Sequence, residues 1–295
     1  MNILVTGSRG QLGSELQELS ALCDNHRFFF YDLPELDITR PDQVVSLCRD
    51  HDIEVIVNCA AYTAVDKAET DAGMAFRVNR DGSEVLAVCA KERNALLLHL
   101  STDYVFDGSS STPYRESDPV APLGVYGHSK WEGEECIRQI APSHIIIRTS
   151  WLYSIYGVNF VKTMLRLGAE RPELNVVVDQ IGTPTWGADL AATIMSIIER
   201  HDRDFHYGVT FHYSNEGVAS WYDFAKAVMD LAGVPCKVLP IESARYPQIA
   251  PRPQYSVLNK SAIKKEWAIE IPYWRDSLAA MIQRLADGGG VSHNT

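Results

Sequence analysis

The chain has 295 residues, of which 46% are hydrophobic and 22% charged, and its formal net charge at pH 7 is −11. These proportions are ordinary for a globular protein, and the net charge excludes nucleic acid as an expected partner, because a phosphate backbone would be repelled. The six cysteines form no C-x-x-C pair, and no stretch has the ~20 apolar residues of a membrane helix. The opening "MNILVTG" leaves no space for a signal peptide. We therefore expect a cytoplasmic protein without a membrane partner.

Short apolar runs rich in β-branched and aromatic residues recur through the first half of the chain. They occupy residues 2–6, 27–32, 54–60, 95–102 and 144–150. The runs are continuous rather than alternating, as expected for strands covered on both faces. Between them lie amphipathic segments long enough for crossover helices, at residues 11–22, 41–51, 68–93 and 127–140. This order predicts an α/β fold, a Rossmann-type doubly wound parallel sheet, over a dinucleotide-binding domain at residues 1–150.

The pattern after residue 150 is less regular. It contains predicted helices at 159–170, 186–200, 220–232 and 273–286 and a predicted strand at 175–179. We expect residues 151–286 to form mainly a smaller C-terminal α/β substrate-binding region, with part of this half returning to the sheet. The Gly-rich tail, residues 287–295, is expected to be flexible.

A glycine turn links the first predicted strand to the first predicted helix. In "TGSRGQLG", Gly7, Gly10 and Gly13 let the backbone turn sharply and let a pyrophosphate approach the helix N-terminus. Asp32 ends the second predicted strand about 20 residues further on, where a carboxylate can hold ribose hydroxyls. The alternative is a tight turn without a ligand, but the whole arrangement predicts dinucleotide binding.

The sequence leaves the choice between NADPH and NADH open. Asp32 would repel a 2'-phosphate, whereas Arg9, inside the glycine turn, could pair with it. Asp37 and Ile38 follow the second strand in "LDIT". They would contact the adenine, or would only cap the helix that Pro41 begins.

Tyr126 and Lys130 lie one helical turn apart in "VYGHSKWEGEE". A lysine beside a phenol lowers the tyrosine pKa and makes it useful for proton transfer, although a solvated surface pair is the alternative. Thr102 and Asp103 follow the fourth predicted strand, at the edge of the sheet where ligands bind. The set of Thr102, Tyr126 and Lys130 suits carbonyl reduction, with a hydride from the cofactor and a proton from the tyrosine.

These motifs together resemble one family. The matching stretches are "GQLG", "NCAAYTAVDKAE", "STDYVFDG", "VYGHSKWEGE", "RTSWLY", "NFVKTMLRL", "DQIGTPT" and "RPQYSVL", and they run through most of the chain. The chain closely resembles the dTDP-4-dehydrorhamnose reductase family of the extended short-chain dehydrogenases/reductases. The resemblance implies reduction of the 4-keto group of the nucleotide sugar dTDP-4-dehydro-6-deoxy-L-mannose to dTDP-L-rhamnose, with NADPH or NADH.

The resemblance also implies residue roles. Tyr126 is the catalytic acid, Lys130 binds the nicotinamide ribose, and Thr102, Asp103 and Trp151 contact the sugar nucleotide. The matching cofactor positions are Gly10, Gln11, Leu12, Asp32, Asp37, Ile38, Ala61, Tyr62 and Thr63. The alternatives are that residues 61–63 form only a loop and that Trp151 belongs to the core. From its chemistry, Arg252 in "RPQYS" is a candidate clamp for the diphosphate, in a pocket that we expect to lack carboxylates.

One departure from the family bears on the oligomeric state. Some members dimerise through a metal ion held by glutamates, one of them in the last helix, where this chain has Arg284. A cation cannot ligate a cation, so we expect no metal, and either a monomer or a homodimer without a metal link.

Other functions compete with this interpretation. Nucleotide-sugar dehydratases carry a glutamate after the aspartate, where this chain has Tyr104. Epimerases use the same tyrosine and lysine. A non-catalytic, NADP-binding regulatory subunit of the methionine adenosyltransferase type is a third alternative, and thymidine against uridine in the substrate stays open.

Overall fold

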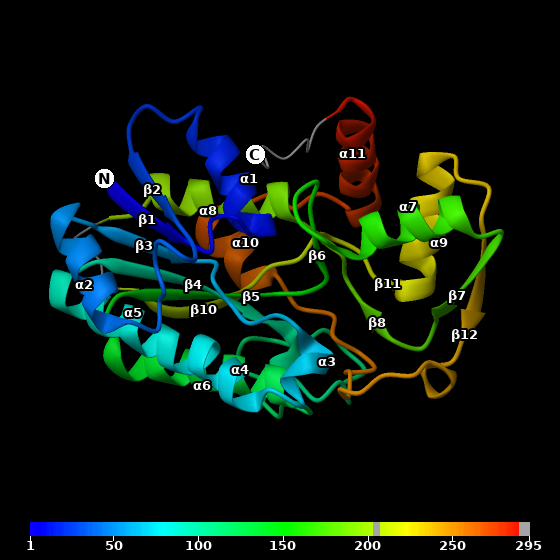
Figure 1. Cartoon of the computed structure of the whole chain (residues 1–295), viewed down its shortest axis with the longest axis horizontal. Helices are drawn as coiled ribbons and strands as arrows, with labels where there is room; N and C mark the ends of the chain where they lie inside the picture. The colour runs from blue at the N-terminus through cyan, green and yellow to red at the C-terminus, as the bar shows by residue number, and fades with distance from the viewer. Residues whose placement is uncertain (203–206, 289–295) are drawn as a thin grey trace.

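The continuous apolar runs form a six-stranded parallel sheet in the computed structural model, which describes residues 1–202 and 207–288 (Figure 1). The strands are β1 (Asn2–Thr6), β2 (Arg27–Tyr31), β3 (Val55–Asn58), β4 (Leu96–Thr102), β5 (His144–Thr149) and β10 (Gly208–His212). Their spatial order is β10-β5-β4-β3-β1-β2. The registers align Val5 with both Phe30 and Val57, and Asn58 with His99.

Helices cover both faces of this sheet, as predicted for a doubly wound fold. One layer contains α1 (Gln11–Ser20), α8 (Gly187–Glu199) and α10 (Ser261–Trp267), and the other contains α2 (Pro41–Asp50), α5 (Gly82–Arg93) and α6 (Val125–Ile140). In β1, Ile3 and Val5 pack into the first layer and Leu4 packs into the second. Both faces of the strand are therefore buried, which explains why its sequence does not alternate.

The strand order places a crevice at the carboxyl edge of the sheet. Strand β1 pairs with β2 on one side and with β3 on the other. The connections that leave β1 and β3 therefore lead in opposite directions along the sheet. In open α/β sheets such a switch point is where ligands bind. Every strand of this sheet is parallel, so the residues that follow β1, β3, β4 and β5 meet at one edge.

A smaller region packs beside this edge (Figure 1). It contains β6 (Leu152–Tyr153), α7 (Phe160–Glu170), β7 (Glu173–Val177), β8 (Ile181–Gly182), β9 (Thr185–Trp186), β11 (Ala219–Ser220), α9 (Trp221–Ala232), β12 (Lys237–Ile241), a 3₁₀ turn η3 (Ser243–Arg245) and α11 (Trp274–Ala286). Its strands pair as β7 with β12, β8 with β11 and β6 with β9. A separate core, which includes Tyr153, Phe224 and Trp274, holds it together.

Two parts of the second half lie on the large sheet rather than in the smaller region. They are β10, which pairs with β5, and the helices α8 and α10. The sequence predicted such a return without locating its strand. The domain boundary at residue 150 stays a prediction, and of the tail predicted to be flexible, residues 289–295 lie outside the described part of the chain.

The predicted helix at 68–93 is wrong as one regular element. The chain instead forms α3 (Val65–Ala68), α4 (Ala72–Phe76), a π-helical turn η1 (Arg77–Asp81) and then α5. A π turn bonds each residue to the fifth one along, so it holds one residue more than an α turn. Within η1, Asn79 is buried and turned toward α6.

Two findings concern membrane-spanning helices and the state of the cysteines. Within the described residues, no helix has the length and apolar character that crossing a membrane requires. All six cysteines are free thiols, and three of them are buried.

Candidate active site

The glycine turn fits a pyrophosphate. Gly7 has a φ of +64°, and a Cβ there would lie 2.6 Å from the Ala60 backbone nitrogen, so the loops after β1 and β3 touch. A Cβ on Gly13 would collide with the Gly7 carbonyl oxygen. The first helix, α1, begins after Gly10 without a side-chain cap, which leaves its first N–H groups free for an anion. Beside this turn, the buried Gln11 Oε1 has no hydrogen-bond partner.

Asp32 and Arg9 lie together at the end of β2. The Asp32 carboxylate accepts the backbone N–H of Arg9 at 2.9 Å and that of Leu33 at 2.8 Å. The Arg9 guanidinium donates to the Leu33 carbonyl at 2.6 Å and pairs with Glu35 at 2.6 Å. The carboxylate and the guanidinium that would compete over a 2'-phosphate thus lie on two neighbouring loops that contact each other, and the choice of cofactor stays open.

Asp37 and Ile38 make different local contacts. Asp37 Oδ1 accepts hydrogen bonds from the N–H and the hydroxyl of Thr39, which closes a turn before α2 without capping that helix directly. Ile38 is buried against the start of α5, where a Cβ on Gly82 would lie 2.7 Å from Ile38 Cδ1. Contact of these two residues with an adenine stays a prediction.

The segment Ala61–Thr63 is anchored to α6. The Tyr62 N–H donates to Asn79 Oδ1 at 2.9 Å, and the Asn79 amide nitrogen donates to the Tyr62 carbonyl at 3.1 Å and to Ser129 Oγ at 2.9 Å. Ser129 in turn donates to the Tyr126 carbonyl at 2.9 Å. The predicted cofactor loop is therefore tied to the first turn of α6, which carries the predicted catalytic tyrosine.

Tyr126 is a buried phenol at the start of α6. Burial raises its pKa to about 12, although a hydrogen bond with the Thr102 hydroxyl works against this shift. The expectation of a lowered Tyr126 pKa is wrong for the resting protein, because burial of the phenol is the largest influence and the net shift is upward. The phenol therefore stays protonated at neutral pH, which is the state that reduction of a carbonyl needs.

Thr102 and Asp103 lie at the end of β4, as predicted. The Thr102 hydroxyl donates to Asp103 Oδ1 at 3.1 Å and accepts the Tyr104 N–H at 3.2 Å, at the start of the 3₁₀ turn η2 (Asp103–Val105). Burial raises the pKa of Asp103 to about 6. The Tyr104 ring packs edge-on against Tyr126, with ring centroids 5.5 Å apart.

Lys130 points inward, so the solvated-pair alternative is wrong. Its side chain is 2% exposed, and Nζ donates to the Leu100 carbonyl at 2.6 Å and lies 3.3 Å from His99 Nε2. Burial lowers the Lys130 pKa to about 8. The lysine therefore lies against β4, below the edge where Thr102 ends the strand.

A buried ion pair holds α6 against the sheet. Glu134, one turn beyond Lys130, receives two hydrogen bonds from Arg148 of β5, Nε to Oε1 at 3.0 Å and Nη2 to Oε2 at 2.7 Å. Ser101 of β4 donates to the same carboxylate at 2.5 Å, and Arg138 donates to it at 2.7 Å. These contacts fix the helix that carries Tyr126 and Lys130 to two strands at once.

Trp151 lies at the carboxyl edge, partly buried and packed against the core of the smaller region. Its φ of +48° is left-handed, which is strained for a side chain of this size. One face of its indole stacks on Trp221 with ring centroids 3.6 Å apart and planes 9° apart. A Cβ on Gly182 would lie 2.6–2.8 Å from three neighbouring indole atoms, so the glycine backbone covers another side of the ring. No sequence pattern predicted the part played by Trp221.

Arg252 is already paired, and its pocket does contain a carboxylate. Its guanidinium donates to Asp66 at 2.8 Å, and this hydrogen bond lowers the Asp66 pKa. Asp66 also accepts the Ala250 N–H at 3.0 Å. The expectation of a carboxylate-free pocket is wrong, because Asp66 from "TAVDKAE" is distant in sequence and adjacent in space.

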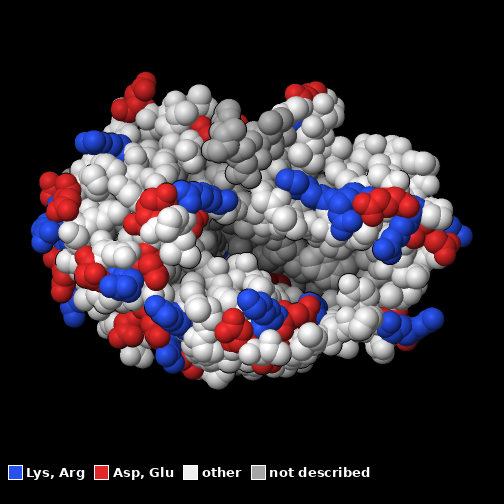
Figure 2. All heavy atoms as spheres, viewed as in Figure 1, with Lys and Arg blue, Asp and Glu red and all other residues white. Residues whose placement is uncertain are grey.

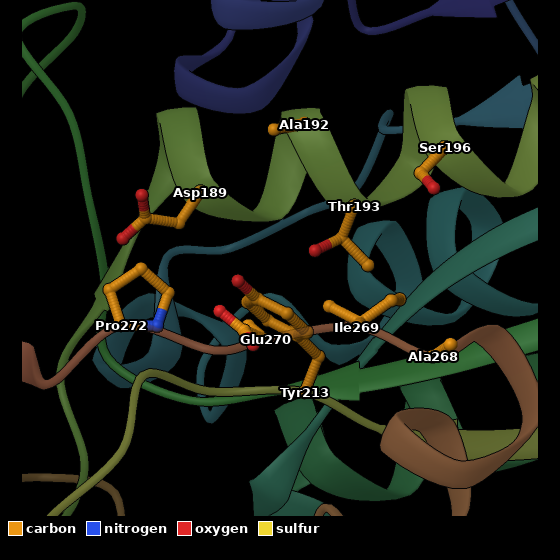
Figure 3. Close-up of a pocket in the computed structure, with 9 residues that line it drawn as sticks. All are labelled: Asp189, Ala192, Thr193, Ser196, Tyr213, Ala268, Ile269, Glu270 and Pro272. Atoms are coloured by element: carbon orange, nitrogen blue, oxygen red, sulfur yellow. The ribbon is translucent and has the colours of Figure 1, made fainter.

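The surface is hollowed between the sheet layers and the smaller region (Figure 2). The glycine turn follows β1, Thr102 ends β4 and Trp151 lies two residues after β5, so all three meet at this edge. The first turn of α6 brings Tyr126 to Thr102. A different hollow of about 290 Å³ lies between α8 and residues 268–272 (Figure 3). Asp189, Thr193, Tyr213 and Glu270 contribute to its lining, which includes no predicted site residue.

Arg284 connects the last helix to the first. It donates to both Glu18 carboxylate oxygens, at 2.6 and 2.8 Å, and lies 3.6 Å from a Glu15 oxygen. Within residues 1–202 and 207–288, no group of three or more His, Cys, Asp or Glu side chains could hold a metal ion. A dimer without a metal link stays a prediction.

Comparison with known proteins gives a consistent result over the whole chain. Residues 1–287 match the family model described as "RmlD substrate binding domain". A dTDP-4-dehydrorhamnose reductase from Aggregatibacter actinomycetemcomitans is 44% identical over 287 residues, which cover 94% of this chain and 96% of the relative. A probable dTDP-4,6-dihydroxy-2-methyloxan-3-one 4-ketoreductase from Streptomyces antibioticus is 39% identical over 290 residues, covering 94% of this chain and 93% of the relative.

Solved structures agree with the sequence relatives. The crystal structure of dTDP-4-dehydrorhamnose reductase from Bacillus anthracis in complex with NADP has a TM-score of 0.91 and 37% identity to this chain. The match covers 96% of this chain and 99% of that one.

Proposed function

This chain belongs to the RmlD substrate binding domain family, and from that premise we propose that it reduces the 4-keto group of dTDP-4-dehydro-6-deoxy-L-mannose to give dTDP-L-rhamnose. The observation that carries the proposal is the buried, protonated phenol of Tyr126 next to Thr102, at the edge where the glycine turn also lies. A regulatory subunit would not need this phenol or its hydroxyl partner.

The cofactor would be NADPH or NADH. The N–H groups at the start of α1 would bind its pyrophosphate, and Asp32 and Arg9, from two neighbouring loops, would meet the adenosine ribose. Residues 61–63, held by Asn79, would lie along the cofactor between these two residues and α6. When bound, the reduced nicotinamide supplies the hydride that attacks C4 of the sugar.

Tyr126 would give its phenolic proton to the oxygen of the former ketone. Thr102 supports this step. In the resting state its hydroxyl donates to Asp103, and with substrate bound it can turn to donate a hydrogen bond to the same oxygen. Lys130, in its charged state, would bind the nicotinamide ribose and stabilise the phenolate that the transfer leaves behind.

The sugar nucleotide would lie between this set and the smaller region. Trp151 supports the proposal because it is held at the sheet edge by Trp221 and Gly182, with an edge of its indole left to contact the sugar. Arg252 would bind the diphosphate by exchanging its hydrogen bond with Asp66 for phosphate oxygens, which match the planar guanidinium equally well.

The second candidate function is the reduction of a different dTDP-4-keto sugar. It is favoured by the 39% identity to the Streptomyces antibioticus 4-ketoreductase, which is close to that of several rhamnose-type relatives. Both reactions deliver hydride to C4, so the catalytic set would be the same and only the sugar contacts would differ.

An absorbance assay tests the proposal. Purified protein at saturating NADPH or NADH is mixed with dTDP-4-dehydro-6-deoxy-L-mannose, its uridine analogue, or the 2-methyloxan-3-one sugar nucleotide. We expect stoichiometric oxidation of the cofactor and formation of dTDP-L-rhamnose with the first substrate. Turnover with the third sugar alone would favour the second candidate. Product without net oxidation would indicate an epimerase, and cofactor binding without turnover of any sugar would indicate a regulatory subunit.

A further inference from the structure

One buried histidine contacts the catalytic lysine and has no role in the mechanism above. His99 lies within the apolar run of β4, fully buried, between Asn58 of β3 and Lys130 of α6. A histidine ring has two nitrogens, and in the neutral ring one donates a hydrogen bond while the other accepts. The neighbours of the ring decide which nitrogen carries the proton.

Asn58 fixes the tautomer of His99. Asn58 Oδ1 accepts the Ala60 N–H at 3.1 Å and the Thr6 hydroxyl at 2.7 Å, so the amide nitrogen must be the atom that faces the ring. That nitrogen lies 3.0 Å from His99 Nδ1 and can only donate. Nδ1 is therefore the acceptor, and a neutral His99 carries its proton on Nε2. Burial keeps the ring neutral by lowering the His99 pKa well below its ordinary value.

The Nε2–H group points at the amine of Lys130, 3.3 Å away. A charged ammonium has three donors and no acceptor, whereas an uncharged amine offers a lone pair. Lys130 also donates to the Leu100 carbonyl at 2.6 Å, which both forms of the amine can do. Only the uncharged lysine satisfies both neighbours without turning Asn58 or the ring.

We propose that His99 is a positioning residue that presents Nε2–H to Lys130, keeps part of the lysine uncharged near neutral pH, and thereby sets the upper end of the pH range of catalysis. This rests on the proposed function only for the role of charged Lys130 in turnover. As the pH rises, the ammonium that binds the ribose and stabilises the phenolate is lost, so the rate falls.

The other groups that face Lys130 act in the opposite direction. Glu134, one turn along α6, and Cys59, after β3, both favour the charged lysine. The Glu134 carboxylate is already engaged by Arg148 and Ser101, which weakens its pull on Lys130. Burial of Lys130 therefore outweighs Glu134 and Cys59 in setting its charge, and the His99 N–H acts in the same direction as burial.

The remaining groups around His99 reinforce its neutral state. Arg138 and His144 both disfavour a positive charge on the ring, as does Lys130. His144 Nδ1 donates to the Ala141 carbonyl at 2.7 Å and leaves the Asn58 contact undisturbed. The tautomer is therefore set from the β3 side alone.

The tautomer can be measured directly in the wild-type protein. Protein labelled with ¹⁵N-histidine gives long-range ¹H–¹⁵N correlations that distinguish Nε2–H from Nδ1–H rings. We expect His99 to be a neutral Nε2–H ring at neutral pH. A neutral Nδ1–H ring or an imidazolium would overturn the proposal, and this result needs neither turnover nor a variant.

The effect on Lys130 is tested with His99→Gln. The glutamine amide can turn its oxygen toward the ammonium, so we expect the Lys130 pKa, followed by ¹³Cε NMR, and the basic limb of kcat to move up together by about one pH unit. The matched control is His212→Gln, since His212 is equally buried but bonds to the Tyr114 carbonyl. A lower rate in both variants with unmoved limbs would show a merely structural role for His99.

The two proposals fail separately. If the wild type turns over no nucleotide sugar, the proposed function fails, while the Lys130 titration in wild type and His99→Gln still decides the inference. If His99→Gln does not fold, the wild-type tautomer decides it. Turnover with an unchanged Lys130 titration in a folded His99→Gln variant would overturn the inference alone.

Discussion

An alanine side chain at position 182 would overlap the indole of Trp151, and Trp221, stacked on that indole, would prevent it from moving away. The new Cβ would lie 2.6–2.8 Å from three indole atoms, whereas ordinary contact begins at 3.4 Å, so the ring would have to move by the difference, about 0.8 Å. Trp221 is stacked at a centroid distance of 3.6 Å and leaves no room in that direction. A displacement of about 1 Å in a positioning group can cost about 10²-fold in rate.

We therefore expect Gly182→Ala to lower kcat/KM for the sugar nucleotide by about 10- to 100-fold. The KM for the cofactor should change little, because the glycine turn follows β1 and contacts the β3 loop rather than β8. Steady-state kinetics with each substrate varied in turn separates the two effects. Gly208→Ala is the matched control, since a Cβ on this strand residue meets no atom within 4 Å.

A double variant tests whether displacement of the Trp151 indole causes the loss. Trp221→Leu added to Gly182→Ala opens space behind the indole, so the double variant should recover part of the lost kcat/KM. A folded Gly182→Ala protein with kcat/KM within twofold of the wild type would refute the reasoning, because Trp151 would then have no contact with the sugar that depends on its position.

Tyr126→Phe should lower kcat by about 10²- to 10⁴-fold with little change in cofactor affinity measured by fluorescence titration, and more than half of wild-type turnover would mean that another group is the acid. Asp32→Ala should raise the NADPH/NADH ratio of kcat/KM and Arg9→Ala should lower it; shifts in the same direction would place neither side chain at the 2'-position. Arg148→Met should cost ~3–5 kcal/mol in urea unfolding at pH 7, because Glu134 would stay buried without its main partner, and a change below ~1 kcal/mol would contradict this. Burial pushes the Glu134 pKa up, but Arg148 holds it below the ordinary 4.5, so this stabilisation is complete above pH 4.5 and is lost as the pH falls through the lowered value.

Local sequence signals predicted the parts of the site that local geometry controls. The glycine turn, Asp32 and Thr102 each sit directly at the end of an apolar run, and the parallel sheet brings such ends to one edge. The one-turn spacing of Tyr126 and Lys130 likewise placed both on α6. For these residues, sequence distance and spatial distance are nearly the same.

Partners from distant segments could not be predicted in this way. Trp221 reaches Trp151 because β11 pairs with β8, and a two-residue pairing leaves no periodic pattern in the sequence. Asp66 and Arg252 are 186 residues apart, so only the folded chain shows that they pair. His99 did carry a signal, because a histidine inside a strand buried on both faces needs polar partners.

The tyrosine pKa shows a different limit. Spacing on α6 brings Lys130 near Tyr126, but it does not tell how deeply either group is buried. In the folded protein burial raises one pKa and lowers the other, so both groups are shifted toward their uncharged forms. The direction of such a shift depends on atoms from outside α6 and cannot be found in one helix.

The π turn η1 has a consequence for sequence alignment. Because the turn holds one residue more than an α turn, the helical faces of Ala72–Phe76 and of Gly82–Arg93 do not follow one continuous 3.6-residue repeat. A relative that lacks the turn would be one residue shorter there and would lose the position from which Asn79 reaches both Tyr62 and Ser129. A single-residue gap between positions 77 and 81 would therefore mark relatives whose cofactor loop is anchored by other means.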